Sequence, residues 1–140
     1  MASEDQIIEA LKTVVESGKV RTDEESLLSH GKDWTKIYTP NPTAIVFPKT
    51  TEEVSQVVKL CAEAKAPIVP QGGNTSLVGG SIPFDSGDEV VISLRRMNTV
   101  RYIDKQGGTL TVEAGCILAN LQQTATDNGF MFPLRIGSEG

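Results

Sequence analysis

The sequence has few of the residues that carry acid–base and metal chemistry. Its 140 residues include one histidine, His30, and two cysteines, Cys61 and Cys116. Two cysteines are too few for a disulfide framework, and together with His30 they fall short of the four ligands of a structural zinc site. A Ser-His-Asp mechanism would depend on His30 alone, and no G-x-S-x-G element is present. The composition therefore excludes disulfide-rich, zinc-stabilised and serine-hydrolase proteins.

Long apolar runs and clusters of basic residues are also missing. No stretch approaches the ~18 apolar residues of a transmembrane helix. The N-terminal stretch MASEDQIIEALK lacks the basic-then-apolar pattern of a secretion signal. The formal charge of −5 argues against a protein that follows nucleic-acid phosphates. We therefore expect a cytoplasmic protein of one-domain length, with no transmembrane segment and no nucleic-acid partner.

Hydrophobic periodicity predicts alternating helices and strands. Ser3 caps a first helix that reaches Gly18, and Thr50 caps the clearest helix, with Glu53 as its capping-box partner. Apolar runs flank this helix, so we expect a strand–helix–strand unit with parallel strands. These patterns predict an α+β fold with a small mixed sheet. The expected segments are a short helical piece at 23–28, an irregular stretch at 29–42, strands at 44–47, 68–70 and 90–94, a hairpin at 99–104 and 110–114, and a helix at 117–128.

A glycine-rich segment, PQGGNTSLVGGS at 70–81, follows the second of these strands. Glycine admits positive φ and close approach of a ligand to the main chain, and successive N–H groups in such a turn form an anion site. Asn74, Thr75 and Ser76 add neutral donors. The common phosphate motifs G-x-x-x-x-G-K-[ST] and G-x-G-x-x-G are both absent. The segment predicts a phosphate cradle that needs few cations, and a ligand-free surface loop is the alternative.

Several segments together resemble a known family. They are the stretch from DWTKIYTPNP through QGGNTSLVGGS at 33–81, VVISLRRMNTV at 90–100, TLTVEAGCILANL at 109–121 and FMFPLRIGSEG at 130–140. In order and spacing they resemble the flavin-binding module of the vanillyl-alcohol oxidase/para-cresol methylhydroxylase (PCMH) superfamily. Within it they are most similar to the FAD-linked D-lactate, glycolate and D-2-hydroxyglutarate dehydrogenases. The resemblance covers residues 30–140 and implies a PCMH-type FAD-binding fold with FAD as cofactor.

The resemblance also implies which residues contact FAD. By similarity, main-chain N–H groups of the glycine-rich segment bind the FAD pyrophosphate, and a second stretch near the C-terminus begins a loop along the ribityl chain and the isoalloxazine ring. Gly115 resembles a position where the backbone requires glycine, and Cys116 is interpreted as a packed small residue. The residues implied as cofactor-binding are Pro70, Gln71, Gly72, Gly73, Asn74, Thr75, Ser76, Leu77, Gly79, Gly80, Pro133, Gly137, Ser138 and Gly140.

The remaining polar residues receive structural interpretations. His30 is expected to be structural, Asp33 and Trp34 to stabilise their loop, and Trp34 and Tyr38 to pack beneath it. Arg95 and Arg96 are interpreted as a solvated pair at a strand end, with a carboxylate partner as the alternative. We expect no catalytic residue and no metal ligand in this chain, because the resemblance places the histidines and metal ligands of the family elsewhere.

The resemblance implies a flavin-dependent oxidoreductase that oxidises a 2-hydroxy acid by hydride transfer to the flavin. We expect residues 1–28 to form an N-terminal helical segment, and residues 29–140 to form the N-terminal portion of a PCMH-type domain that ends inside its second cofactor loop. The electron acceptor would be a quinone, a cytochrome or an electron-transfer flavoprotein. Two alternatives stay open: an inactive fragment with weak or no FAD binding, and a superfamily member acting on an alditol, a sugar lactone or a phenol. Formation of a homo-oligomer is also left open.

Overall fold

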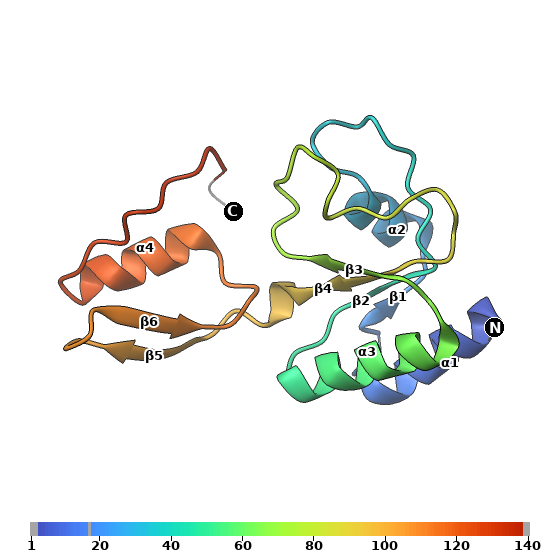
Figure 1. Cartoon of the computed structure of the whole chain (residues 1–140), viewed down its shortest axis with the longest axis horizontal. Helices are drawn as coiled ribbons and strands as arrows, with labels where there is room; N and C mark the ends of the chain where they lie inside the picture. Colours follow the sequence, from blue (N-terminus) through green and yellow to red (C-terminus); the bar gives the residue numbers. More distant parts are fainter. Residues whose placement is uncertain (1–2, 17, 139–140) are drawn as a thin grey trace.

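The computed structural model describes residues 3–16 and 18–138, which form two units joined by a short 3₁₀ turn (Figure 1). The larger unit contains α1 (Glu4–Val14), β1 (Val20–Arg21), α2 (Glu24–Gly31), β2 (Ala44–Val46), α3 (Thr51–Ala64), β3 (Ile68–Gln71) and β4 (Val90–Ser93). The turn is η1 (Leu94–Arg96), and the smaller unit contains β5 (Val100–Asp104), β6 (Thr109–Val112) and α4 (Leu118–Asp127).

The predicted N-caps Ser3 and Thr50 are confirmed, whereas the capping box predicted for Thr50 and Glu53 does not form, because Glu53 Oε2 accepts from the Lys49 N–H at 2.6 Å. Ser3 and Gln6 form a reciprocal capping box, in which the Gln6 N–H donates to Ser3 Oγ and the Ser3 N–H donates to Gln6 Oε1 at 2.9 Å. The Thr50 hydroxyl accepts a hydrogen bond from the Glu53 N–H at 3.1 Å and so begins α3. α1 ends at Val14, earlier than predicted. α2 continues to Gly31, beyond the short helical piece expected from the sequence.

The main sheet is mixed and has the strand order β1-β2-β4-β3. β2 and β3 both run parallel to β4, so the predicted parallel strands are confirmed, with β4 lying between them. β1 is a strand of two residues that the sequence pattern does not predict, and it pairs antiparallel with β2. This arrangement confirms the α+β fold with a mixed sheet.

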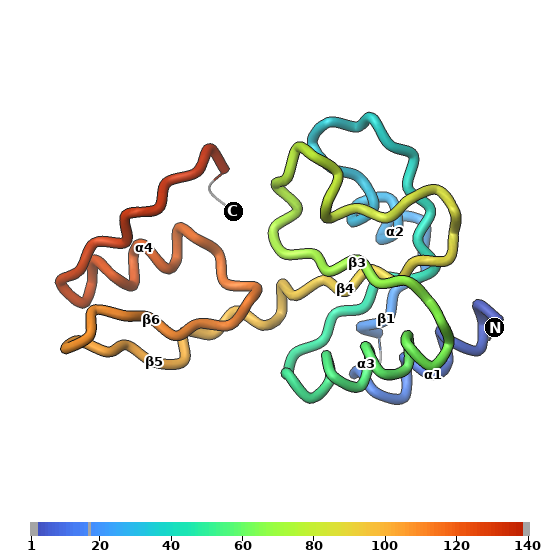
Figure 2. Tube along the Cα trace, in the orientation of Figure 1, coloured from blue at the N-terminus to red at the C-terminus, as the bar shows by residue number. Residues whose placement is uncertain are grey.

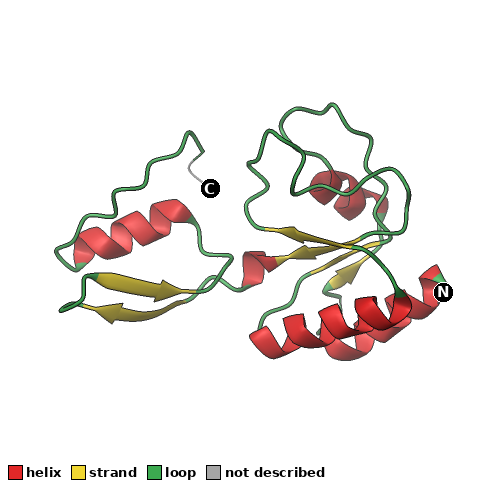
Figure 3. Ribbon diagram, in the orientation of Figure 1, coloured by secondary structure: helices red, strands yellow, loops and turns green. Residues whose placement is uncertain are grey.

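The sheet has a hydrophobic layer on each face, because successive strand residues point to opposite sides. Ala44 and Val46 contribute to the core shared with α1 and α3, which cover one face (Figure 3). Ile45, between them in sequence, faces the opposite layer, where Leu27 of α2 packs. The described part of the first 28 residues therefore shares its core with the strands that follow.

The smaller unit is an antiparallel hairpin with α4 packed alongside it (Figure 2). The predicted hairpin is confirmed, but it forms its own two-stranded sheet and does not extend the main one. In the part of the chain that the structure describes, no helix has both the length and the apolar character needed to cross a membrane.

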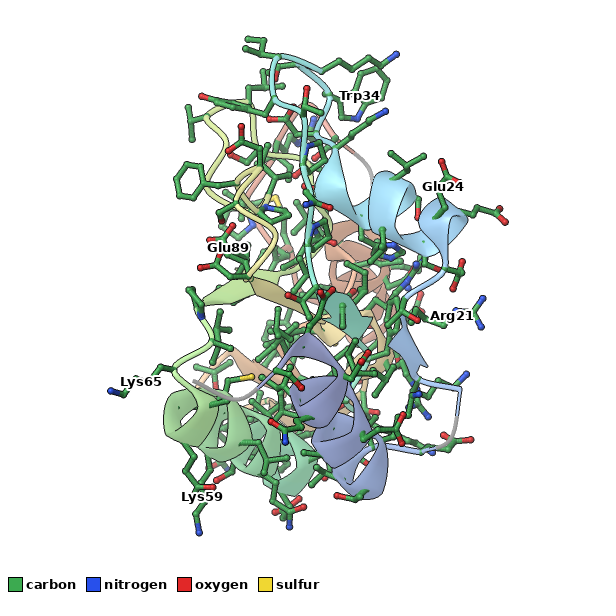
Figure 4. The ribbon with its side chains drawn as sticks, turned by 90° about the vertical axis from the view of Figure 1, so that its right-hand side faces the viewer. Arg21, Glu24, Trp34, Lys59, Lys65 and Glu89 are labelled. Atoms are coloured by element: carbon green, nitrogen blue, oxygen red, sulfur yellow. The ribbon has the colours of Figure 1, made fainter. Side chains whose placement is uncertain are left out.

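One packing expectation is wrong. Trp34 does not lie under a loop: it is 78% exposed and its ring points away from the body of the protein (Figure 4). The neighbouring Asp33 side chain is buried and holds the turn by accepting hydrogen bonds from the Thr35 and Lys36 N–H groups at 2.9 and 3.2 Å. Tyr38 is half exposed and its ring lies beside Gly79. The turn is therefore stabilised by Asp33 rather than by the indole.

Candidate functional site

A cleft of about 970 Å³ lies between the two units, at the carboxyl ends of β3 and β4. Gln71 and Ser93 are partners at the ends of these parallel strands, so the segments that follow both strands leave the sheet side by side. Ligands of open parallel sheets commonly bind outside the carboxyl ends of the strands. The cleft wall consists of residues 29–36, 71–75, 93–98 and 114–118, together with Ile136 and Ser138, with gaps within these ranges.

The glycine-rich loop presents its main chain to this cleft. Gly72 and Gly73 are exposed, and a Cβ at Gly72 would meet nothing within 4 Å. Asn74 has a φ of +54°, a left-handed conformation that turns the chain back on itself. Among the described residues, no hydrogen-bond acceptor is found for the N–H groups of residues 73–76. The loop therefore offers a series of unpaired donors to a ligand in the cleft.

Side chains hold this loop from both of its ends. Gln71 is buried, and its Nε2 donates to the carbonyl oxygens of His30 at 2.7 Å and Ser81 at 2.9 Å. Asn74 Nδ2 donates to the Lys32 carbonyl at 2.7 Å, and the Ser81 hydroxyl donates to Asn74 Oδ1 at 2.9 Å. The side chains of Gln71 and Asn74 therefore bond within the protein and fix the loop, and its main-chain N–H groups remain available to a ligand.

His30 lies in the cleft wall with both ring nitrogens engaged. Arg95 Nη1 lies 3.1 Å from Nε2, and since a guanidinium only donates, Nε2 accepts and Nδ1 carries the proton. Nδ1 lies 2.9 Å from Ser29 Oγ and 3.2 Å from the Ser26 carbonyl oxygen. The ring also packs edge-on against Phe47, with centroids 5.0 Å apart. Burial first, and the nearby Arg95 charge as well, lower the pKa of His30.

This environment gives a prediction for the single histidine of the chain. In an NMR titration, the His30 pKa should lie below the ordinary histidine value, and Arg95→Gln should raise it part of the way back. The unfolded chain then takes up a proton at a higher pH than the folded chain does. The stability that neutral His30 contributes is complete above the pKa of His30 in the unfolded chain. It is lost as the pH falls through the lower pKa of His30 in the folded chain. A His30 pKa at or above the ordinary value would contradict this environment.

Residues 114–118 form the opposite wall of the cleft. The Gly115 N–H donates to the Met97 carbonyl at 2.8 Å, and a Cβ at Gly115 would lie 2.6 Å from the Leu94 carbonyl carbon. The predicted backbone requirement for glycine is confirmed. The Cys116 thiol is half-buried and donates to the Thr99 carbonyl at 3.5 Å, so it is packed as predicted.

The structure brings part of the predicted site together. Six of the predicted residues line the cleft, namely Gln71, Gly72, Gly73, Asn74, Thr75 and Ser138. Seven others lie outside its lining, namely Pro70, Ser76, Leu77, Gly79, Gly80, Pro133 and Gly137. Gly140 lies outside the described residues. The cofactor roles of all these residues stay predictions.

Sequence reasoning missed several residues of the cleft wall. Ser29, Lys32, Asn98 and Ile117 line it although no motif marks them, and it also contains His30 and Arg95, for which the sequence suggests structural and solvated roles. Arg96 is not a solvated residue, since it donates to the Phe47 carbonyl at 2.9 Å and pairs with Glu16. One feature of the sequence could have indicated Arg95 as a residue of the cleft: it comes just after the apolar strand β4, which lies beside β3 and the glycine-rich loop.

The chemistry of this cleft is that of a binding site for an anion. Its donors are main-chain N–H groups, and the cations Arg95, Lys32 and Lys36 in its wall outnumber the carboxylate of Asp33, which also lines it. Within residues 3–16 and 18–138, no three His, Cys, Asp or Glu side chains gather closely enough to hold a metal ion. The arrangement suits a ligand that carries phosphate groups and extends between the two units.

Comparison with known proteins gives consistent results. The sequence model of a family described as FAD binding domain matches residues 42–140. The chain is 41% identical over 134 residues to D-2-hydroxyglutarate dehydrogenase of Stutzerimonas stutzeri, covering 96% of this chain and 28% of the relative. It is 42% identical over 123 residues to the mitochondrial D-2-hydroxyglutarate dehydrogenase of Danio rerio, covering 88% of this chain and 23% of the relative.

The fold also matches solved structures. p-Cresol methylhydroxylase with bound substrate superposes with a TM-score of 0.75 at 22% identity, covering 90% of this chain and 25% of that one. At this level of identity the match concerns the fold alone. The chain thus spans about a quarter of the length of the proteins that it matches.

Proposed function

The chain belongs to the FAD binding domain family, its cofactor is FAD, and on this premise we propose that the protein oxidises a small 2-hydroxy acid with the bound flavin as hydride acceptor. The PCMH-type fold expected from the sequence resemblance is confirmed. The substrate class is supported by the similarity to D-2-hydroxyglutarate dehydrogenases, of which this chain spans about a quarter.

The observation that carries the proposal is the row of unpaired main-chain donors beside the cleft. We assign the FAD diphosphate to the main chain of residues 71–76, because a diphosphate needs several donors and the N–H groups of residues 73–76 have no acceptor among the described residues. A cleft of about 970 Å³ is at the upper end of the range for small-molecule sites, about 300–1,000 Å³, which suits a dinucleotide. The donor set and the volume both fit FAD.

The other assigned residues complete the proposed site. Pro70 and Leu77 shape the loop, Gly79 and Gly80 lie close to the cofactor, and the stretch 133–140 with Pro133, Gly137, Ser138 and Gly140 follows the ribityl chain and the flavin ring. Ile136 and Ser138 in the cleft wall support this course for the stretch. We further propose that residues 29–140 form the N-terminal portion of the cofactor domain and that residues 1–28 form an N-terminal helical segment that precedes it.

The chain's own residues bind and orient the cofactor. When bound, FAD supplies the acceptor for the hydride that leaves C2 of the hydroxy acid. The glycine-rich loop holds the diphosphate, while Gln71 and Asn74 keep that loop in place. We assign no catalytic base to this chain: His30 has both ring nitrogens engaged, and accepting a substrate proton would break its contact with Arg95.

A substrate assay tests this function. The protein at its natural length, loaded with FAD, should bleach the flavin absorbance anaerobically with one of D-lactate, glycolate and D-2-hydroxyglutarate, and should reduce a dye acceptor with the same acid. L-Lactate serves as the stereochemical control. Bleaching by an alditol, a sugar lactone or a phenol, with none by the three acids, would overturn the substrate class and leave the cofactor assignment standing.

The partners of the reaction are further proposals. The electron acceptor is a quinone, a cytochrome or an electron-transfer flavoprotein. Self-association is supported by the exposed apolar side chains of Met131 and Leu134. A cytoplasmic location is supported by two free cysteines, of which Cys61 is buried with its thiol pKa raised to about 11. The mitochondrial matrix is the alternative compartment, and cell fractionation distinguishes the two.

A further inference from the structure

Arg95 projects from the turn after β4, where its position is determined by His30. The guanidinium lies 3.1 Å from His30 Nε2, and this contact joins two segments that are 65 residues apart. His30 is in turn tied to the glycine-rich loop, because its carbonyl accepts from Gln71 Nε2 at 2.7 Å. Arg95, His30 and the start of the glycine-rich loop therefore form one continuous set of contacts along the cleft.

The charge of Arg95 is not neutralised by a carboxylate, in contrast to the charges of three of the four other arginines. Arg21 pairs with Asp23, Arg96 with Glu16 and Arg101 with Glu113, all through ion pairs. Within residues 3–16 and 18–138, no carboxylate pairs with Arg95, and its partner is the neutral ring of His30. A histidine acceptor occupies one N–H and leaves the remaining donors and the full charge available. This arrangement orients a cation toward the cleft without cancelling it.

We propose that Arg95, positioned by His30, binds the diphosphate of FAD alongside the main-chain donors of the glycine-rich loop, from the end of the neighbouring strand β4. The planar guanidinium suits two phosphate oxygens at once. Gly72, Gly73 and Arg95 follow neighbouring parallel strands whose last residues are register partners, and all three line the same cleft. The loop then contributes neutral donors, and Arg95 contributes the positive charge.

The same chemistry would suit a carboxylate, so the substrate is the other source of an anion. The diphosphate is favoured because Arg95 connects through His30 and Gln71 to the loop that we assign to phosphate. The inference rests on the proposed function, since it requires FAD in this cleft. Here Arg95 is a binding residue and His30 a positioning residue.

Binding measurements on the natural-length protein test the inference. Arg95→Gln should raise the dissociation constants of FAD and ADP about 10- to 100-fold, because a charge-assisted hydrogen bond is lost, and should leave riboflavin, which has no phosphate, unchanged. Arg21→Gln removes the same charge from a residue that points to solvent (Figure 4) and should change none of the three. The dependence of FAD affinity on salt should weaken in Arg95→Gln alone.

The role of His30 is tested by rescue. His30→Leu removes the acceptor and should weaken FAD binding, whereas His30→Gln, whose Oε1 accepts near the Nε2 position, should restore most of it. Wild-type affinities for FAD and ADP in Arg95→Gln would overturn the inference, and a loss confined to binding of the 2-hydroxy acid would reassign Arg95 to the substrate. Failure of the wild-type protein to bind FAD would instead overturn the proposed function itself.

Discussion

Replacing Gly73 by aspartate should weaken FAD binding about 1,000-fold while the protein stays folded. A Cβ at Gly73 has Thr75 Cγ2 as its nearest neighbour at 3.7 Å, an ordinary contact, so the side chain is accommodated. Its carboxylate would then stand beside the donors that we assign to the diphosphate. Two like charges 4 Å apart repel by about 4 kcal/mol at an effective dielectric constant of 20, which weakens binding by about three orders of magnitude.

The matched control for this variant is Gly73→Asn, which has the same shape without the charge. Titration of flavin fluorescence with wild type, Gly73→Asn and Gly73→Asp separates the charge from the bulk of the side chain. Circular dichroism of the three proteins verifies that they are folded. FAD affinity in Gly73→Asp equal to that of Gly73→Asn would show that the diphosphate does not lie at this loop.

Among the glycines that the structure describes, Gly115 is the one whose replacement by alanine should cause the largest loss of stability. The added carbon would lie 2.6 Å from the Leu94 carbonyl carbon and 3.0 Å from the Met97 carbonyl oxygen. Both atoms belong to the backbone, so no rotamer change relieves the overlap, and the Gly115–Met97 hydrogen bond would have to open. We expect a loss of about 3 kcal/mol or more in the free energy of unfolding.

Urea denaturation followed by fluorescence measures this loss. Gly80→Ala is the control, because a Cβ there meets nothing within 4 Å and the residue does not have positive φ. Gly80→Ala should unfold within about 1 kcal/mol of wild type. Equal midpoints for the two variants would mean that the backbone around Leu94 moves more easily than its packing indicates.

Local patterns make much of the fold predictable. Ser3 and Gln6, and Thr50 and Glu53, are spaced as capping residues, and their hydrogen bonds follow from that spacing. The strand β1, Val20–Arg21, is not predicted, because two residues are too few to show the alternation of apolar and polar side chains that indicates a strand. The place of β4 between β2 and β3 escapes it as well, since strand order depends on long-range packing that neighbouring residues do not encode.

The site is predictable where its chemistry lies in one segment. Glycine at 72 and 73 followed by Asn74 indicates a main-chain anion site from the residue types alone. The contact between His30 and Arg95 joins segments that are 65 residues apart, and no local sequence pattern predicts it. Gln71 matches the family loop, yet its side chain bonds to His30 and Ser81 inside the protein. A single sequence does not distinguish a side chain that bonds inside the protein from one that contacts the ligand.

The short connection at η1 between the two units has a consequence for how they unfold. Both buried hydrophobic clusters belong to the larger unit, whereas among the described residues of β5, β6 and α4 the one buried hydrophobic side chain is Ala125. The smaller unit therefore opens at a lower free-energy cost than the sheet of the larger unit does. A ligand that touches both walls of the cleft shifts this local equilibrium toward the closed form by mass action. Bound FAD would thus supply contacts that the smaller unit does not obtain from a hydrophobic core of its own.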